Sequence, residues 1–211
     1  MKYYRAIFDL DGTLLDTSEG IFEAVKHTIK VMGYKSLSDD EILDFIGPPI
    51  QNSLMSHLGI SNEKSQIGAN IFRDYYKSTS LLLAKPYEGI YKLLEQLKLN
   101  GIQMAVATYK REDYAIQLLD EFKLSDYFSI IHGADNNNMM EKKDIIDLCN
   151  TELGNTNEKI VYIGDTMGDY LAAEKCGIDF IGVTYGFGFK KNNIQKYSLA
   201  NNCEDLKNYL L

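Results

Sequence analysis

Two aspartates separated by one residue are the first feature of this sequence that suggests chemistry. Asp9 and Asp11 follow a short apolar run, 3–8, and Gly12 comes directly after them. Residues two apart in a strand point to the same side, so both carboxylates can approach one point if the backbone turns. Gly12 permits such a turn. The pattern indicates a carboxylate site, the alternative being two solvated acids in a loop.

Acids and a hydroxyl also follow other apolar runs. Asp165 comes after the run 160–163, with Asp169 four residues on, and Thr108 comes after the run 102–107. A carboxylate in this position suits a metal site, although an aspartate that caps the next helix is an equal alternative. A threonine hydroxyl, with the N–H groups of the next turn, can hold a phosphate oxygen.

A lysine at the start of a predicted helix is the fourth candidate. Helical steps from Lys142 reach the apolar residues Ile145, Ile146, Cys149 and Leu153. A lysine on such a buried stripe needs an anionic partner, whereas the same steps from Lys143 reach polar residues. The helical face therefore favours Lys142 over Lys143, which remains the alternative. We expect the nearby cations Lys110 and Arg111 to be solvated surface charges.

The elements that must position these residues alternate along the chain. Apolar runs at 3–8, 102–107, 128–131, 160–163 and 180–183 predict strands, and the patterns at 88–100, 112–122, 142–153 and 168–176 predict helices. This alternation predicts an α/β fold with a parallel sheet covered by helices on both faces. Ligand sites of such sheets lie outside the carboxyl ends of the strands, where the candidate residues stand.

A long insertion separates the first two predicted strands. It contains helical patterns at 21–32, 38–46, 50–58 and 63–83, with no strand alternation between them. A simple crossover between parallel strands needs only about a dozen residues or more. We therefore expect an α/β core formed by 1–16 and 84–211, interrupted by an all-helical cap formed by 17–83.

Charge and composition exclude several classes of protein. The chain has 22 Lys and Arg against 30 Asp and Glu, a net charge of −8, which argues against nucleic-acid binding by phosphate neutralisation and against a polybasic membrane surface. No apolar stretch of about 18 residues predicts a membrane span. Three cysteines without a CxxC pair indicate neither a disulfide framework nor a zinc site. We expect a cytoplasmic protein.

Taken together, these motifs resemble a known family. Asp9-x-Asp11-Gly12-Thr13, Thr108, Lys142 and Gly164-Asp165-x-x-x-Asp169 are similar, in order and strand placement, to the four motifs of the haloacid dehalogenase-like (HAD) hydrolases. The resemblance covers the whole chain and implies a Rossmann-like core with a C1-type cap. The segments DLDGTLLDT (9–17), FIGPP (45–49) and GVTYGFG (182–188) are similar to the phosphoglycolate phosphatase-like branch.

The resemblance implies a role for each aspartate. Asp9 would be the nucleophile that forms an aspartyl-phosphate, and Asp11 the general acid and base. A departing halide needs no proton, so Asp11 favours phosphoryl transfer over dehalogenation. Carboxylates about 4 Å apart repel by roughly 4 kcal/mol at an effective dielectric of 20, which a hard cation such as Mg²⁺ relieves. Its ligands by resemblance are Asp9, the backbone carbonyl of Asp11 and Asp165, with Asp169 direct or through water.

Other residues would contact the substrate. Thr108 and Lys142 would neutralise the transferring phosphate oxygens. Tyr109 stands where the family commonly has a smaller residue, and we expect it to point toward the cap and narrow the substrate pocket. Proline-rich Gly47-Pro48-Pro49 precedes a predicted helix whose N-terminus can attract an anion, unless it is a simple turn. The predicted substrate-binding residues are Gly12, Thr13, Thr108, Tyr109, Lys142, Gly47 and Pro48.

The sequence therefore predicts a Mg²⁺-dependent phosphatase of a small phosphorylated metabolite, with a phosphoglycolate-like substrate favoured. The alternatives are a phosphomutase of the β-phosphoglucomutase type, a 5′-nucleotidase or a pyrophosphatase. A non-catalytic binding module is disfavoured because all four core acids are present. We expect no nucleic-acid or membrane partner, and a monomer or homodimer.

Overall fold

The first apolar run forms the centre of a parallel sheet. The computed structural model describes residues 2–135, 140–154, 159–189 and 196–211. Within them, six strands pair in the order β5-β4-β1-β6-β7-β8, and every pairing given for them is parallel. The strands are β1 (Arg5–Phe8), β4 (Gln103–Arg111), β5 (Ile130–Ala134), β6 (Ile160–Gly164), β7 (Asp179–Val183) and β8 (Ser198–Ala200). The predicted α/β class is thereby confirmed.

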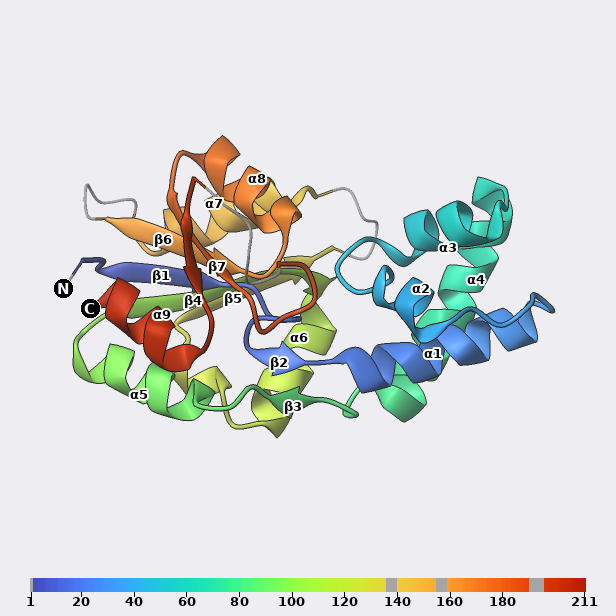
Figure 1. The fold of residues 1–211 in the computed structure, drawn as a ribbon, viewed down its shortest axis with the longest axis horizontal. Helices are drawn as coiled ribbons and strands as arrows, with labels where there is room; N and C mark the ends of the chain where they lie inside the picture. The colour runs from blue at the N-terminus through green and yellow to red at the C-terminus, as the bar shows by residue number, and fades with distance from the viewer. Residues whose placement is uncertain (1, 136–139, 155–158, 190–195) are drawn as a thin grey trace. The chain divides into compact units, whose positions relative to one another are not determined.

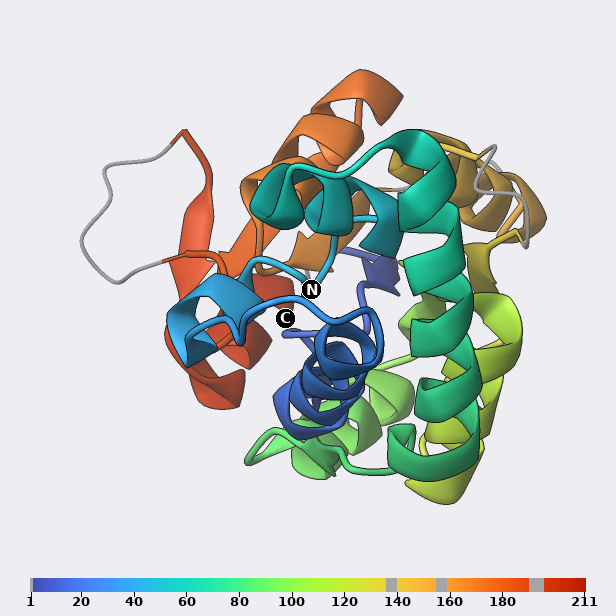
Figure 2. The same cartoon turned by 90° about the vertical axis from the view of Figure 1, so that its right-hand side faces the viewer.

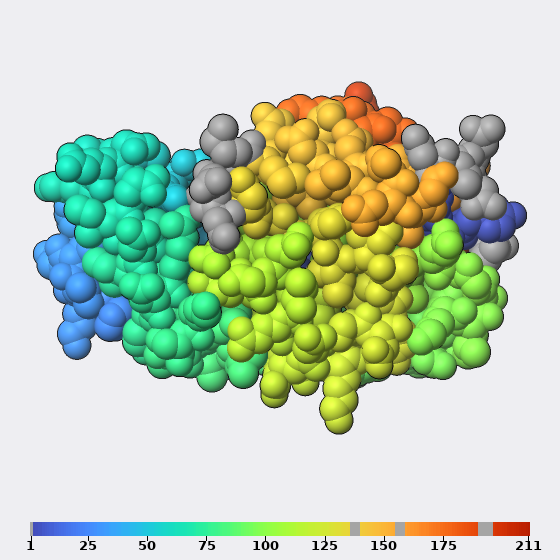
Figure 3. Space-filling model, turned by 180° about the vertical axis from the view of Figure 1, so that it is seen from behind, coloured from blue at the N-terminus to red at the C-terminus, as the bar shows by residue number. Residues whose placement is uncertain are grey.

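Helices cover both faces of this sheet (Figure 1). α7 and α8 lie over one face and α5 and α9 over the other, while α6 packs against β4 and β5. Their bounds are α5 (Ile90–Leu99), α6 (Glu112–Glu121), α7 (Lys142–Glu152), α8 (Met167–Cys176) and α9 (Cys203–Leu210), with a short 3₁₀ turn at Ser125–Tyr127. Seen from behind, the surface of the part that contains the sheet is formed mainly by the green-to-gold stretch of chain from α5 to α7 (Figure 3).

Alternation along the strands produces the core under α7 and α8. Ile7, Ala105 and Tyr162 point to that face and pack against the apolar side of α7. The buried residues of α7 are Lys142, Ile145, Ile146 and Cys149, which is the stripe that the helical period places on one side. The first member of an otherwise apolar stripe is thus a lysine.

The chain divides into two compact units. Unit 1 comprises Met1–Asp16 and Pro86–Leu211, and unit 2 comprises Thr17–Lys85. The expected insertion, 17–83, ends two residues before unit 2 does. The chain leaves unit 1 at β2 (Leu15–Asp16) and returns at β3 (Lys85–Pro86).

Apart from Lys85, the first residue of β3, the elements of unit 2 are all helices. They are α1 (Ser18–Val31), α2 (Asp39–Leu43), α3 (Ile50–Leu58), α4 (Asn62–Tyr75) and a π-helical turn at Tyr76–Ser80. α4 packs against both α1 and α3 (Figure 2). Gly68 of α4 permits the close approach, because a Cβ there would lie 2.8 Å from a methyl carbon of Leu54.

Several element bounds differ from the sequence-based expectation. The strand expected at 128–131 begins later and extends to Ala134, since Gly133 lies against the backbone of Glu112, where a Cβ would come within 2.5 Å of its amide nitrogen. The helix expected at 63–83 is α4 followed by the π turn. The patterns predicted neither β8 nor α9, and the three-residue β8 presents no apolar run. Within the described residues, no helix is long and apolar enough to cross a membrane.

Candidate active site

Asp9 and Asp11 stand where β1 gives way to a tight turn. The Asp9 amide still donates to Ile163 O at 2.8 Å, so Asp9 continues the strand beside β6. The Gly12 amide then donates to Leu15 O at 2.9 Å and closes the turn. Gly12 has φ of +79°, and a Cβ there would lie 2.2 Å from Asp165 Oδ2. Glycine therefore both forms the turn and leaves room for the Asp165 carboxylate.

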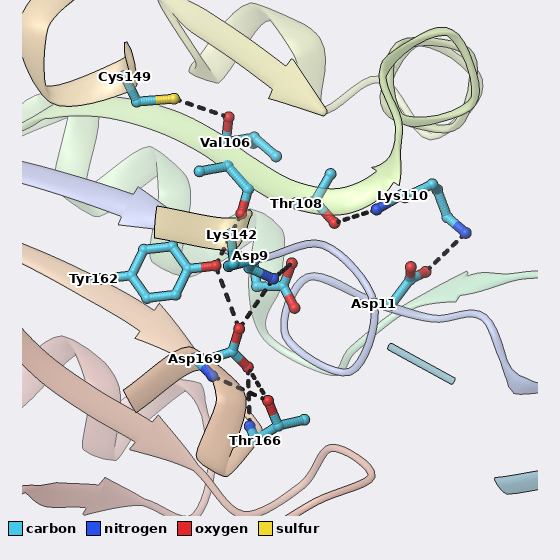
Figure 4. A network of polar contacts seen from close by, with 11 residues as sticks. Asp9, Asp11, Val106, Thr108, Lys110, Lys142, Cys149, Tyr162, Thr166 and Asp169 are labelled. Atoms are coloured by element: carbon cyan, nitrogen blue, oxygen red, sulfur yellow. Dashed lines mark hydrogen bonds and ion pairs between the residues drawn. The ribbon is translucent and has the colours of Figure 1, made fainter. Parts of the chain in front are cut away.

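Lys142 lies between the carboxylates of Asp9 and Asp169 (Figure 4). Its Nζ is 2.8 Å from Asp9 Oδ1 and 3.0 Å from Asp169 Oδ1, and all three side chains are buried. Lys143 lies on the other side of α7, where its half-exposed ammonium pairs with Asp147 at 2.6 Å. The structure thus brings Lys142, and not Lys143, to the aspartates.

Asp169 is held by the start of α8. Thr166 is the N-cap of the helix, its hydroxyl accepts from the Asp169 amide at 3.2 Å, and it donates to Asp169 Oδ2 at 2.7 Å. This reciprocal capping box fixes the carboxylate, and it shows that Asp165 is not the helix cap. The buried Tyr162 hydroxyl donates to Ala107 O at 2.8 Å and lies 3.5 Å from Asp169 Oδ1. Sequence reasoning missed Tyr162, which reads as an ordinary strand residue.

Asp165 is enclosed by the loop that follows β7. The Phe187 amide donates to Asp165 Oδ2 at 2.7 Å, and the Phe189 amide donates to Asp165 O at 2.9 Å. Gly186 is required for this approach, because a Cβ there would lie 2.5 Å from Asp165 Cβ, and Gly188 likewise lies against the Asp165 backbone. Sequence reasoning did not assign this loop a role at the site. The glycine pair after an apolar strand was the available signal.

Asp9, Asp165 and Asp169 together can hold a metal ion. One carboxylate oxygen from each lies within 4.8 Å of the others, and all three residues are buried. Mg²⁺ binds oxygens at 2.0–2.1 Å in octahedral geometry, which places neighbouring ligand atoms about 3 to 4 Å apart. Asp165 Oδ1 is buried without a hydrogen-bond partner in the described residues. An acceptor left unsatisfied in a cluster of hard oxygen ligands fits a divalent cation.

Electrostatics support the same interpretation. Burial raises the pKa of Asp9 to about 6, with Lys142 acting against the rise and Asp169 adding to it. Burial also raises the pKa of Asp165 well above its ordinary value, helped by Asp169 and Asp9. Burial works against the Lys142 ammonium, but Asp169 and Asp9 outweigh it and raise the pKa of Lys142. With all three acids ionised, the pocket would carry more negative charge than Lys142 neutralises, which is why the pKa values of Asp9 and Asp165 are raised.

The end of β4 supplies the other side of the site. Thr108 is buried, and its hydroxyl accepts from the Lys110 amide at 3.2 Å. The Tyr109 ring centroid lies 5.6 Å from Lys142 Nζ, and the ring packs against the apolar cluster under α7 and α8.

Lys110 corrects an expectation from the sequence. Its Nζ lies 3.1 Å from Asp11 Oδ1, and its side chain is only 6% exposed. The expectation of a solvated surface charge is therefore wrong for Lys110. The sequence pattern carries no clear signal for this pairing, because the register of β4 with β5 shifts between Ala107 and Arg111 and interrupts the period of two.

The remaining predicted substrate residues divide between the two units. Thr13 is fully buried beside the turn of Gly12, and its hydroxyl has no hydrogen-bond partner in the described residues. Gly47 and Pro48 belong to unit 2, where Gly47 has φ of +103° and both residues are exposed ahead of α3. The structure thus brings together the predicted residues of unit 1, and describes Gly47 and Pro48 within unit 2 by itself.

Comparison with known proteins agrees with this geometry. A 5′-nucleotidase of Pseudomonas aeruginosa is 30% identical over 207 residues, which cover 98% of this chain and 93% of that protein. A phosphoglycolate phosphatase of Aquifex aeolicus is 30% identical over 195 residues, covering 92% and 91%. The crystal structure of a predicted phosphatase from Clostridium acetobutylicum superposes with a TM-score of 0.89 at 33% identity, covering 99% and 98%.

A family assignment follows from these matches and from the site. The family profile described as haloacid dehalogenase-like hydrolase matches residues 6–183, a range that includes Asp9, Thr108, Lys142 and Asp165. The resemblance noted in the motifs is therefore confirmed. The chain belongs to the haloacid dehalogenase-like hydrolases.

Proposed function

We propose that this hydrolase is a Mg²⁺-dependent phosphatase of a small phosphorylated metabolite, acting through an aspartyl-phosphate on Asp9. The observation that carries the proposal is that Lys142 bridges Asp9 and Asp169 in a cluster with Asp165, while Asp11 pairs separately with Lys110. A nucleophilic carboxylate needs cations around it to accept a phosphate dianion. The names of the relatives, a nucleotidase and a phosphatase, support the same reaction class.

The residues of unit 1 divide the chemistry between them. Asp9 attacks phosphorus, and the bond to the leaving oxygen breaks while Asp11 gives that oxygen a proton. Asp11 then removes a proton from the water that hydrolyses the aspartyl-phosphate. Thr108 and Lys142 hold the phosphate oxygens. When bound, Mg²⁺ supplies positive charge that offsets the carboxylates and the phosphate; Asp9, the Asp11 carbonyl and Asp165 would hold it, with Asp169 directly or through water.

A phosphoglycolate-like substrate is our preferred assignment. The N-terminus of α3, which follows Gly47 and Pro48, has no side-chain cap hydrogen bond in the described residues, and a helix start attracts anions. We propose that it recognises a carboxylate or a second phosphate. The helical unit 2 would then be a C1-type cap.

Three free cysteines suit a reducing compartment. We therefore propose that the protein is cytoplasmic, and that it is a monomer or homodimer without nucleic-acid or membrane partners.

A substrate panel tests this assignment. We expect phosphoglycolate to show a kcat/KM at least about tenfold above that of ethyl phosphate, equivalent to about 1.4 kcal/mol for recognition of the carboxylate. The panel includes 5′-nucleoside monophosphates, pyrophosphate and β-glucose 1-phosphate, with inorganic phosphate and sugar phosphates measured separately. A higher kcat/KM for a nucleotide or for pyrophosphate would make that compound the assigned substrate in place of phosphoglycolate. Isomerisation of β-glucose 1-phosphate without phosphate release would show a phosphomutase instead.

Removal of the metal is expected to make stability depend on pH. Asp9 and Asp165 have raised pKa values in the folded chain, so the folded state binds more protons than the unfolded state above about pH 4. Stability of the EDTA-treated protein should therefore fall as pH rises from 5 to 7.5, through the Asp9 pKa of about 6. Mg²⁺ at about 100 times its Kd should add about 2.7 kcal/mol at pH 7.5, and less at pH 5. Thermal denaturation measures both.

Two aspartate variants control this experiment. Asp165→Asn removes one of the buried acids and should abolish the Mg²⁺ response, with a metal-free Tm at pH 7.5 equal to or above that of the unchanged protein. Asp147→Asn alters an exposed acid on α7 and should keep the full response. A Mg²⁺ response that survives in Asp165→Asn, or one that is larger at pH 5 than at pH 7.5, would contradict the metal site.

A further inference from the structure

Lys110 and Asp11 form a nearly buried ion pair at the edge of the site. Lys110 Nζ lies 3.1 Å from Asp11 Oδ1, with the side chains 6% and 10% exposed. Figure 4 shows this pair set apart from the cluster that Lys142 forms with Asp9 and Asp169. Such a pair is screened far less by water and salt than a surface pair. It therefore constrains where the Asp11 carboxylate points.

The backbone of β4 brings Lys110 to this place. β4 runs on to Arg111, and its register with β5 shifts between Ala107 and Arg111, which is the irregularity of a β-bulge. Bulges re-aim side chains next to active sites. Gly133 of β5 admits the bulged chain, because a Cβ there would lie 2.5 Å from Lys110 O. The Lys110 amide is tied to Thr108 Oγ1 at 3.2 Å, so the lysine is anchored at both ends.

The two lysines divide the acids of the site into two groups. Lys142 pairs with Asp9 and Asp169, which with Asp165 form the cluster that can hold a metal. The Asp11 carboxylate is not in that cluster and has Lys110 instead. A side-chain oxygen that is to reach a leaving group must be kept from turning toward a bound cation. An ammonium group on the opposite side achieves this by direct attraction.

We propose that Lys110 is the positioning residue for Asp11: its ammonium holds the carboxylate outside the metal cluster and directs it to the leaving oxygen. This role rests on the proposed phosphatase function. Lys110 does not take part in a bond change. To act as the acid, Asp11 must carry a proton, which its other carboxyl oxygen can hold while Oδ1 accepts from Lys110. That proton moves to the leaving oxygen as the phosphorus–oxygen bond breaks, and Asp11 recovers one from the water that hydrolyses the aspartyl-phosphate. Loss of Lys110 therefore matters in proportion to how much the leaving group needs that proton.

Two phosphate esters separate this role from others. Ethyl phosphate has a poor leaving group that needs an acid, whereas p-nitrophenyl phosphate has a good one that needs little help. Neither carries a second anionic group. Lys110→Met keeps most of the aliphatic stem and removes the charge. Because general acids contribute about 10²- to 10⁴-fold, we expect Lys110→Met to lower kcat/KM for ethyl phosphate by about 10- to 100-fold, and for p-nitrophenyl phosphate by no more than about threefold.

Three further variants make the experiment specific. Lys110→Arg should recover part of the ethyl phosphate activity, since it restores the charge. In an Asp11→Asn background, Lys110→Met should add less than about a twofold loss, because residues that act as a unit are not additive. The adjacent Arg111, which pairs with Asp113 at 2.8 Å, provides the matched control, and Arg111→Met should leave both esters unchanged.

Other outcomes would overturn the proposal. Equal losses for the two esters would show that Lys110 binds the phosphate or only supports the fold, and additive losses in the Asp11→Asn background would show that it acts independently of Asp11. A loss confined to substrates with a second anion would make it a substrate-binding residue. If the unchanged protein hydrolyses neither ester, the proposed function itself fails, and the role of Lys110 with it.

Discussion

Replacing Asp9 by asparagine is expected to abolish phosphate ester hydrolysis while leaving the chain folded. The amide cannot attack phosphorus, so kcat should fall by at least about 10⁴-fold, as for other essential nucleophiles. The fold should survive, because Lys142 keeps Asp169 as a partner at 3.0 Å and a neutral group replaces a carboxylate that burial already disfavours. Release of inorganic phosphate from p-nitrophenyl phosphate and thermal denaturation measure the two effects.

Two controls distinguish a lost nucleophile from a damaged site. Asp147→Asn, on the exposed side of α7, should retain full activity. Asp11→Asn should still transfer phosphate from p-nitrophenyl phosphate to the protein, and mass spectrometry after acid quenching should find the phosphate on the Asp9 peptide. Hydrolysis retained by Asp9→Asn, or a phosphopeptide that lacks Asp9, would refute the assignment of the nucleophile.

Replacement of Lys142 should have the second largest effect. Lys142→Ala removes the cation between Asp9 and Asp169 and leaves two buried carboxylates without their partner. Removing one member of a buried ion pair costs about 3–5 kcal/mol, and loss of a group that stabilises charge in the transition state costs about 10²- to 10³-fold in kcat. Chemical denaturation with EDTA present and initial rates with saturating Mg²⁺ measure these separately.

Lys143 offers the matched comparison one residue away. Its ammonium pairs with Asp147 on the half-exposed side of α7, so Lys143→Ala should change neither activity nor stability appreciably. If Lys142→Ala does not fold, Lys142→Met retains the apolar stem on the buried stripe and tests the charge alone. A greater loss of activity in Lys143→Ala than in the Lys142 variants would show that Lys143, and not Lys142, has the catalytic role.

The parallel sheet and its acids were predictable because their signal is local. A strand buried on both faces must be almost continuously apolar, and the residue that ends such a run must lie at its carboxyl end. Asp9 and Asp165 are therefore recognisable from their place after runs of apolar residues. Lys142 is recognisable because a helix repeats every 3.6 residues, so a lysine in phase with Ile145, Ile146 and Cys149 has to be buried with them.

Tertiary structure decided the features that join distant parts of the chain. Lys110 reaches Asp11 through a bulge in β4 that Gly133 of the neighbouring strand makes possible. Asp165 is enclosed by amides more than twenty residues away in the sequence. Glycines are required in that loop because side chains there would collide with Asp165. A pattern of residue types predicts the period of a single helix or strand, but it does not predict which distant segments approach one another. The sequence thus determined which groups could react, and the contacts between strands and loops decided which charges each of them meets.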